Sequence, residues 1–293
     1  MTRPPVVVVG LDCATGLQTA RLFAARGIDV IGVAADPRHP CTRTRSCRRL
    51  VMAPRDPEGL VAELLELGRR LDQPAVLLPC TDLAVLGVSR HRSELAAYYR
   101  HAVPEPAVTE TLLDKARFAE FATACALPIP TTHVIRDLGD ARTAARETAY
   151  PCILKPAVKS VRWGVTAPTK VVVVESARAL VDIYSRHADC ADAFVVQELV
   201  HGGDEDHYTC DCYLGGDGQP LVTFCARKLR QWPPVGGQGC LSVEHRNDVV
   251  RDLTVRLFQA AGHHGQGYLE VKRDARTGRH LILEANVGRS PGR

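Results

Sequence analysis

The sequence predicts two kinds of architecture in one chain, an α/β part with a parallel sheet followed by an α+β part with an antiparallel sheet. The first is indicated by residues 6–9, a run of valines that ends in Gly10 and leads through an amphipathic segment at 17–26 to an apolar strand at 30–33. Apolar strands joined by a helix are typical of a βαβ unit with a buried sheet. The second is indicated from residue 193 onward, where alternating strands follow one another across short turns.

The α/β rhythm continues with a helix over 58–71, a strand over 75–78, a helix from 83 towards 95 and a short strand over 102–106. Asp82 follows the strand at 75–78, at the edge where open α/β sheets place ligand groups, although a helix cap would also explain it. The turn GLDCATG has Gly10 and Gly16, but neither the G-x-G-x-x-G spacing nor the Gly-Lys-Ser/Thr of a P-loop. This argues against an NAD-dependent oxidoreductase, which the first βαβ unit alone would suggest.

Composition and length limit the classes of function. The chain has 293 residues, enough for two or more domains, and its 37 Lys and Arg against 33 Asp and Glu leave a net charge of +4. The most basic run, RTRSCRR at 43–49, is short and lacks aromatics, so no nucleic-acid partner is expected. We find no membrane-spanning stretch and no secretion signal, and the eleven scattered cysteines are best explained as reduced thiols. We therefore expect a cytoplasmic protein with no membrane partner.

Lys115 stands at an unusual place in a predicted helix. The helix begins at Thr111 or Asp114 and ends before Pro128, so Lys115 falls in or near its first turn. The helix dipole disfavours a cation there unless the cation meets an anion.

Lys155 is delivered by YPCILKP, an otherwise apolar strand, so its charge must be paired or must snorkel to water. A loop with Lys159 and a strand over 170–174 follow. Strand, basic loop and strand predict a flap that closes over phosphates, with a plain hairpin as the alternative.

The segment GYLEVKRDARTGRHLILEANVGR, residues 267–289, predicts a β-hairpin with two carboxylates on one face. If Asp274 pairs with His280, the register sets Glu270 opposite Glu284. Alternation then divides the second strand into an apolar face (Leu281, Leu283 and Ala285) and a functional face (Ile282, Glu284 and Asn286).

Facing carboxylates repel each other unless a cation lies between them. The candidate ligands Glu270, Glu284 and Asn286 are all oxygens, so Mg²⁺ is favoured over zinc. A solvated surface hairpin is the alternative.

Several segments together resemble the ATP-grasp superfamily and, within it, carboxylate-amine ligase-like proteins related to the carbamoyl-phosphate synthase large-chain and D-aspartate ligase types. They are DKARFAEFATACALPIPTT, YPCILKP, VVQELVHGGDED, RKLRQWPPVGGQG, and YLEVKRD with LILEANVGR. The resemblance covers nearly the whole chain. It implies a Rossmann-like N-terminal domain over 1–106, a linker helix and small central lid over 107–199, and an antiparallel-sheet C-terminal domain over 200–293, with ATP gripped between the last two.

The resemblance also implies roles for individual residues. Those that would hold ATP are Lys115 and Lys155 at the phosphates, Glu198, Leu199 and Val200 at the adenine, and Asp206, preferred by spacing over Glu205, at the ribose. Those that would hold the metal are Glu270, Glu284 and Asn286. The catalytic candidates are Lys228 and Arg230, which would reach phosphate or the acyl intermediate, and Arg289, which stands near the arginine that ordinarily follows the metal ligands.

The activity implied is ATP-dependent ligation of a carboxylate to an amine through an acylphosphate, with an amino acid or small carboxylate as substrate, Mg²⁺ (or Mn²⁺) as metal and a homodimer as assembly. Two departures stand out. Val287 and Gly288 replace the proline of the usual Glu-x-Asn-Pro-Arg, which moves Arg289 one place later, and the sequence ends four residues after Arg289, where similar proteins usually continue. The alternative is therefore a truncated, non-catalytic ATP-binding or regulatory homologue. The sequence does not identify the carboxylate or the amine.

Overall fold

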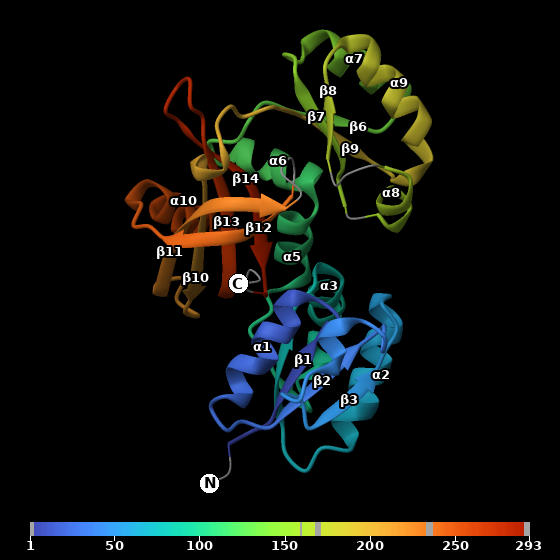
Figure 1. Ribbon diagram of the computed structural model, residues 1–293, viewed down its shortest axis with the longest axis vertical. Coiled ribbons are helices and arrows are strands. Elements are labelled where there is room, and N and C mark those ends of the chain that lie inside the picture. Colours follow the sequence, from blue (N-terminus) through green and yellow to red (C-terminus); the bar gives the residue numbers. More distant parts are fainter. Residues whose placement is uncertain (1–2, 159, 168–170, 233–236, 290–293) are drawn as a thin grey trace.

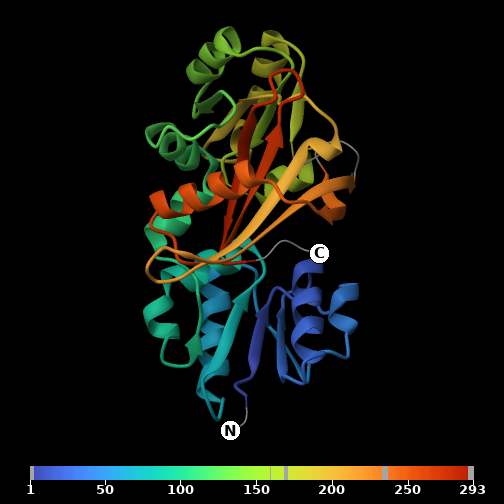
Figure 2. The ribbon, with the colours of Figure 1, turned by 90° about the vertical axis from the view of Figure 1, so that its left-hand side faces the viewer.

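The protein contains three β-sheets in the part of the chain that the structure, a computed structural model, describes: residues 3–158, 160–167, 171–232 and 237–289. The sheet nearest the N-terminus lies at the bottom of the molecule in Figure 1, and the other two sheets lie above it. The view turned by 90° shows the same separation (Figure 2). No helix among the described residues is both long enough and apolar enough to span a bilayer.

The N-terminal sheet is parallel throughout, with strand order β3-β2-β1-β4-β5. Its strands are β1 (Val6–Val9), β2 (Val30–Ala34), β3 (Arg49–Met52), β4 (Ala75–Pro79) and β5 (Tyr99–Arg100). Its helices are α1 (Ala14–Ala24), α2 (Pro57–Arg69), α3 (Asp82–Arg90) and α4 (Arg92–Leu95), with a 3-10 turn η1 (Pro40–Arg43). The valines of β1 are at most 2% exposed, which confirms the buried βαβ unit.

Two local predictions in this region are wrong. The strand expected over 102–106 is absent, because the edge strand is Tyr99–Arg100 and Pro106 begins a helix instead. Proline cannot donate to a sheet ladder but suits the first turn of a helix. The single helix expected from 83 to 95 is divided at His91 into α3 and α4.

Two helices connect the N-terminal sheet to the rest of the chain, α5 (Pro106–Leu113) and α6 (Lys115–Ala124). Asp114 caps α6 by accepting hydrogen bonds from the backbone N–H groups of Ala116 and Arg117, at 2.8 and 3.3 Å. This confirms Asp114 as a helix start and places Lys115 in the first turn. Leu112 and Phe118 of these helices belong to one apolar core that also contains side chains of the first and third sheets.

The second sheet has four strands in the order β6-β9-β7-β8, and its neighbours are antiparallel. The strands are β6 (Thr132–Ile135), β7 (Cys152–Pro156), β8 (Val172–Val174) and β9 (Phe194–Glu198). The helices are α7 (Leu138–Glu147), α8 (Val161–Thr166) and α9 (Ala177–His187), with a 3-10 turn η2 (Ala188–Cys190). α7 and α9 pack side by side over one face (Figure 1).

The predicted flap between β7 and β8 is not a simple loop. The helix α8 lies within it, capped by Ser160, whose Oγ accepts a hydrogen bond from the Trp163 N–H at 3.2 Å. Trp163 is buried in the core under this sheet, which explains why the segment folds back as a helix. Lys159 and Lys170 of the predicted flap lie outside the described residues.

The third sheet is antiparallel, with strand order β12-β11-β10-β13-β14. Its strands are β10 (His207–Leu214), β11 (Pro220–Trp232), β12 (Gln238–Glu244), β13 (Gly265–Arg273) and β14 (His280–Val287). A 3-10 turn η3 (Asp204–Asp206) precedes it, and α10 (Asp248–Ala260) packs against one face.

The hairpin of β13 and β14 pairs Glu270 with Glu284, as the sequence predicts. The turn register was nevertheless wrong, because His280 pairs with Arg273 and not with Asp274. The register shifts by one residue beyond Glu270, where Val271 pairs with Ile282. Such a bulge leaves one residue unpaired and exchanges the faces beyond it.

The bulge corrects the predicted faces of β14. Leu283 is the residue left without a paired neighbour. Ile282, expected on the functional face, is fully buried in the main core together with Ala285. Leu281 is buried outside that core cluster, opposite Lys272.

Candidate functional site

The candidate site lies on the face of the third sheet that is turned away from α10. Leu269 and Val271 of β13 are fully buried in the core on the α10 side. Successive side chains of a strand point to opposite faces, so Tyr268, Glu270 and Lys272 share the other face. Alternation in the sequence had already placed Lys272 on the face of Glu270, but of these three residues only Glu270 was predicted as a site residue.

Glu270 and Glu284 are cross-strand neighbours on this face, and a lysine from a distant helix meets them. Lys115 Nζ lies 3.9 Å from Glu284 Oε1, with the two side chains 17% and 33% exposed. The backbone N–H of Lys115 donates to the Ala157 carbonyl at 2.9 Å, which holds the start of α6 beside the end of β7. The anion that Lys115 needed at a helix N-terminus is therefore a carboxylate of the site.

Lys155 is the most deeply buried cation of the group. It is 9% exposed, and its Nζ donates to Gln197 Oε1 at 3.2 Å, while Gln197 Nε2 donates to Thr132 Oγ1 at 3.1 Å. Burial lowers the Lys155 pKa to about 8, opposed by the charges of Glu284 and Glu270 and reinforced by that of Lys115. These mutual effects place both lysines and both glutamates in one electrostatic cluster between the second and third sheets.

The residues predicted at the adenine and ribose lie where the second sheet leads into the third. Glu198 ends β9, with its N–H donating to the Thr131 carbonyl at 2.9 Å, and Leu199 and Val200 follow directly. The Glu198 carboxylate lies 3.8 Å from the Arg276 guanidinium.

Of the two candidate ribose carboxylates, Asp206 is the more enclosed. Its side chain is 16% exposed and lies 3.7 Å from Arg273 Nη1, and it accepts a hydrogen bond from the Gly203 N–H at 3.0 Å. Glu205 is exposed. Asp206 also acts on Lys272, whose pKa is lowered by burial and raised again by Asp206.

Lys228 and Arg230 of β11 are separated by the structure. Lys228 pairs with Ser242, whereas Arg230, beyond a register shift, pairs with Leu241. Adjacent residues of β12 point to opposite faces, so Lys228 and Arg230 do too. Arg230 is exposed.

Lys228 lies in a basic group with His207 and Lys272, which the sequence did not predict. His207, at the start of β10, has its pKa lowered to about 3, first by burial and then by the charges of Lys228 and Lys272. His207 pairs with Lys272 across the sheet. The imidazole is therefore neutral at pH 7, and the two ammonium groups carry the charge here.

Arg289 is held by three side chains. Its Nε lies 2.6 Å from Asp82 Oδ1, its Nη1 donates to the Tyr268 hydroxyl at 2.9 Å, and its Nη2 donates to Asn286 Oδ1 at 2.6 Å. The guanidinium also stacks over the Tyr268 ring, with Cζ 5.5 Å from the centroid. For Asp82 the sequence allowed two interpretations, a helix cap or a ligand group. In the structure it contacts Arg289 of the candidate site, 207 positions away in the sequence.

The oxygen donors fit a hard divalent cation. Asn286 is 1% exposed, and its amide nitrogen has no hydrogen-bond partner among the residues that the structure describes, so this buried amide is incompletely satisfied there. Among the described residues no three His, Cys, Asp or Glu side chains are grouped closely enough to hold a metal ion. The candidate donors are therefore limited to the carboxylates of Glu270 and Glu284 and the amide of Asn286. Mg²⁺ commonly binds through few protein oxygens and completes its shell with water and phosphate.

Comparison with known proteins points to one fold. No family model matches the chain. D-aspartate ligase from Enterococcus faecium (strain Aus0004) is 22% identical over 226 residues, 73% of this chain and 54% of that protein. The chain spans about half the length of the curated relatives it matches.

Solved structures match over almost the entire chain. L-amino acid ligase from Bacillus licheniformis has a TM-score of 0.70 at 13% identity, over 98% of this chain and 67% of that one. The biotin carboxylase domain dimer of Hydrogenobacter thermophilus 2-oxoglutarate carboxylase, in complex with MgADP, ADP and bicarbonate, has a TM-score of 0.70 at 16% identity, over 96% and 63%. The chain has an ATP-grasp fold. The resemblance to ATP-grasp carboxylate-amine ligases that the sequence suggests is confirmed.

Proposed function

We propose that this ATP-grasp chain is an ATP-dependent ligase that joins a carboxylate to an amine through an acylphosphate, forming an amide or peptide-like bond. One observation carries the proposal: Glu270 and Glu284 stand side by side on the third sheet, against Lys115 and the buried Lys155. Two carboxylates can hold a divalent cation while two lysines face phosphate oxygens, and this arrangement neutralises a transferring phosphoryl group. A solvated surface hairpin would not need a lysine buried beside it.

The nucleotide would lie between the second and third sheets. Lys115 and Lys155 are assigned to the phosphates, and the strand end at Glu198 with Leu199 and Val200 to the adenine. Asp206 is assigned to the ribose, supported by its enclosed position beside Lys272.

Glu270, Glu284 and Asn286 would hold Mg²⁺, which when bound neutralises charge on the phosphates and orients them. Mn²⁺ would fit the same donor set, since it also prefers carboxylate and carbonyl oxygens. The similarity to a protein in complex with MgADP supports this assignment.

A carboxylate is a poor acyl donor, because its leaving group would be oxide. In the proposed reaction a carboxylate oxygen attacks the γ-phosphorus and ADP leaves. The amine nitrogen then attacks the acyl carbon, phosphate leaves with the bonding electrons, and the nitrogen gives its proton to water. The chain contributes positioning and positive charge, for which Lys228, Arg230 and Arg289 were the sequence candidates. The geometry supports Lys228, on the functional face, more than the exposed Arg230.

We further infer the domain plan and the substrates. The strand order of the N-terminal sheet supports a Rossmann-like domain over 1–106, and the other two sheets support a lid over 107–199 and a C-terminal domain over 200–293. The similarity to D-aspartate ligase and L-amino acid ligase supports an amino acid as one substrate and a small carboxylate or amine as the other. A homodimer is proposed by analogy with the dimer among the similar structures.

The test is ADP release by the purified chain with ATP and Mg²⁺ across a panel of amino acids. We expect release that depends on substrate and that Glu284→Gln abolishes, because the variant weakens the metal site without changing side-chain size. Glu66→Gln is the control, since Glu66 lies on α2 and pairs with Arg69 and Arg70.

Two other results would contradict the ligase. ATP binding without ADP release across a broad panel would support a non-catalytic ATP-binding or regulatory homologue. Selective binding of a nicotinamide nucleotide with no ATP binding would instead favour an NAD-dependent oxidoreductase.

A further inference from the structure

We propose that Asp82 is a positioning residue for the metal site, acting from the N-terminal sheet through Arg289 on Asn286. The inference rests on the proposed function, because it concerns how the assigned ligand Asn286 is oriented. Its starting point is the contact between Asp82 and Arg289, which joins the first sheet to the third.

Asp82 is well placed to hold a cation. It is the first residue of α3, directly after Thr81, whose hydroxyl caps that helix by accepting a hydrogen bond from the Ala84 N–H at 3.2 Å. A carboxylate in the first turn is stabilised by the helix dipole. β4 ends just before it, next to β1, where the strand order of the sheet reverses.

Arg289 has little freedom to move. Its side chain is 12% exposed, and that of Asp82 is 16% exposed. Each of its three nitrogens has a partner, in Asp82, Tyr268 and Asn286. The guanidinium is a planar, rigid fork, so fixing one nitrogen on Asp82 fixes the direction of the other two.

The turn after β14 brings Arg289 to this position. Gly288 has a φ of +68°, and its N–H donates to the Gln266 carbonyl at 2.7 Å. A Cβ at Gly288 would lie 3.0 Å from a methyl of Val85 on α3. The substitution of Val-Gly for the usual proline therefore packs the end of β14 against the same helix that carries Asp82.

Asn286 is the receiving end of this chain of contacts. Its Oδ1 accepts a hydrogen bond from Arg289, while its buried amide nitrogen has no partner within the described part of the chain. The hydrogen bond from Arg289 thus fixes the orientation of the Asn286 amide, with the oxygen towards Arg289. Tyr268, the cross-strand neighbour of Asn286, accepts a hydrogen bond from the same guanidinium. An amide oxygen has a second lone pair that remains for a cation. Residues that orient a metal ligand typically change metal affinity by about 10- to 100-fold when they are lost.

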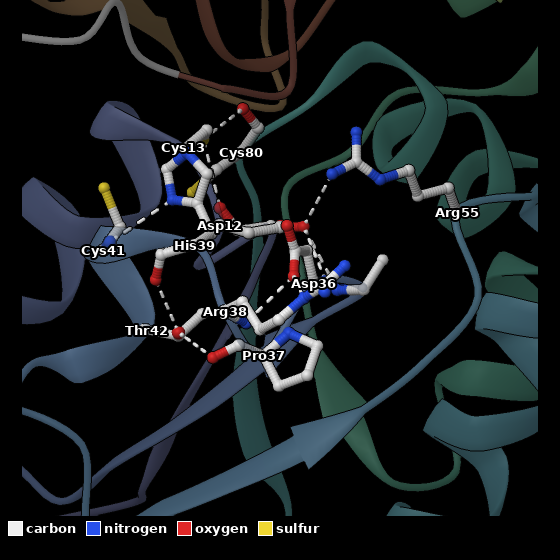
Figure 3. Close-up of polar contacts among 12 residues, drawn as sticks. Asp12, Cys13, Asp36, Pro37, Arg38, His39, Cys41, Thr42, Arg55 and Cys80 are labelled. Carbon is white, nitrogen blue, oxygen red and sulfur yellow. Dashed lines mark hydrogen bonds and ion pairs between the residues drawn. The ribbon is translucent and has the colours of Figure 1, made fainter.

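The matched control is Asp12, at the same edge of the N-terminal sheet. Asp12 Oδ2 lies 3.1 Å from Arg55 and accepts hydrogen bonds from the N–H groups of Ala35 and Asp36 (Figure 3). Its side chain is 9% exposed, so Asp12→Asn removes an enclosed carboxylate of an ion pair, as Asp82→Asn does. These contacts of Asp12 are with the segments that follow β2 and β3, and they do not include Asn286.

The experiment is calorimetric titration of β,γ-methylene-ATP into each variant over a series of Mg²⁺ concentrations. For Asp82→Asn we expect the Mg²⁺ concentration at half-maximal nucleotide binding to rise about tenfold. Asp12→Asn should match the wild type. Tyr268→Phe, which keeps every charge, should shift the Mg²⁺ dependence in the same direction but less, and it decides the question if Asp82→Asn does not fold.

An unchanged Mg²⁺ dependence in Asp82→Asn would overturn this inference and leave the proposed function standing. An equal shift in Asp12→Asn would also overturn it, since the effect would then be general destabilisation. Absence of nucleotide binding by the wild-type chain would instead contradict the proposed function itself, and this inference with it.

Discussion

Replacing Lys155 with methionine separates the effect of the buried charge on protein stability from its effect on ATP binding. Burial lowers the Lys155 pKa from its ordinary 10.5 to about 8, so the folded state disfavours the charged form. At about 1.4 kcal/mol per pK unit, the penalty is about 3 kcal/mol at pH 7, where the lysine is protonated in both states. Methionine keeps the unbranched stem and removes this penalty.

The gain in stability is partly offset, because the partners of Lys155 lose their hydrogen bond and their compensating charge. Gln197 Oε1 loses its donor, and an unsatisfied buried acceptor costs about 1–3 kcal/mol. Glu284 and Glu270 also lose the charge that compensates them. We therefore expect Lys155→Met to be as stable as the wild type at pH 7, or more stable by up to about 2 kcal/mol. Its affinity for ATP should nevertheless collapse.

The assay is urea unfolding of both proteins at pH 7 and at about pH 9.5, with the difference between them taken at each pH. Above pH 8 the folded wild type releases the Lys155 proton, while the unfolded chain retains it up to about 10.5. The wild type should therefore gain about 2 kcal/mol relative to Lys155→Met between the two pH values.

Loss of more than about 3 kcal/mol at pH 7, or a difference that does not change with pH, would refute the reasoning. Gln197→Met is the control, because it removes the hydrogen-bond partner, retains Lys155 and should keep the pH dependence of the wild type.

Two further predictions concern stability. The His207 pKa is lowered from 6.5 to about 3, mainly by burial and then by two lysines, so the unfolded chain binds a proton that the folded chain does not as pH falls through this window. His207→Gln should lose less stability than the wild type in urea unfolding between pH 7 and about pH 5, and equal acid sensitivity would contradict this. Gly16→Ala should destabilise the protein by about 1–3 kcal/mol, because its Cβ would lie 2.2 Å from the Gly10 carbonyl oxygen. Gly164→Ala is the control, because apart from its chain neighbours and its own helix backbone no atom of the described residues lies within 4 Å of the new Cβ. An equal loss of stability there would contradict the steric explanation.

Patterns between neighbouring residues predicted most of the local structure. The valines of β1 indicated a strand buried on both faces, and Asp114 indicated the start of α6. The pairing of Glu270 with Glu284 was also predicted, although the assumed turn was one residue out of register. A bulge in β14 offsets that error, and no local pattern marks Leu283 as the extra residue.

The sequence by itself predicted most of the strands and helices, although not α8 or the division between α3 and α4, and it brought two carboxylates together in one hairpin. These features depend on residues that are close along the chain. Only the tertiary structure decided that Lys115 meets Glu284, that Lys155 is buried beside Gln197, and that Asp82 holds Arg289. Asp82 and Arg289 are 207 positions apart, and such pairs meet only when separate sheets pack against each other. Alternation and capping fix the direction of a side chain within its own element, whereas sheet packing decides which distant side chain it faces.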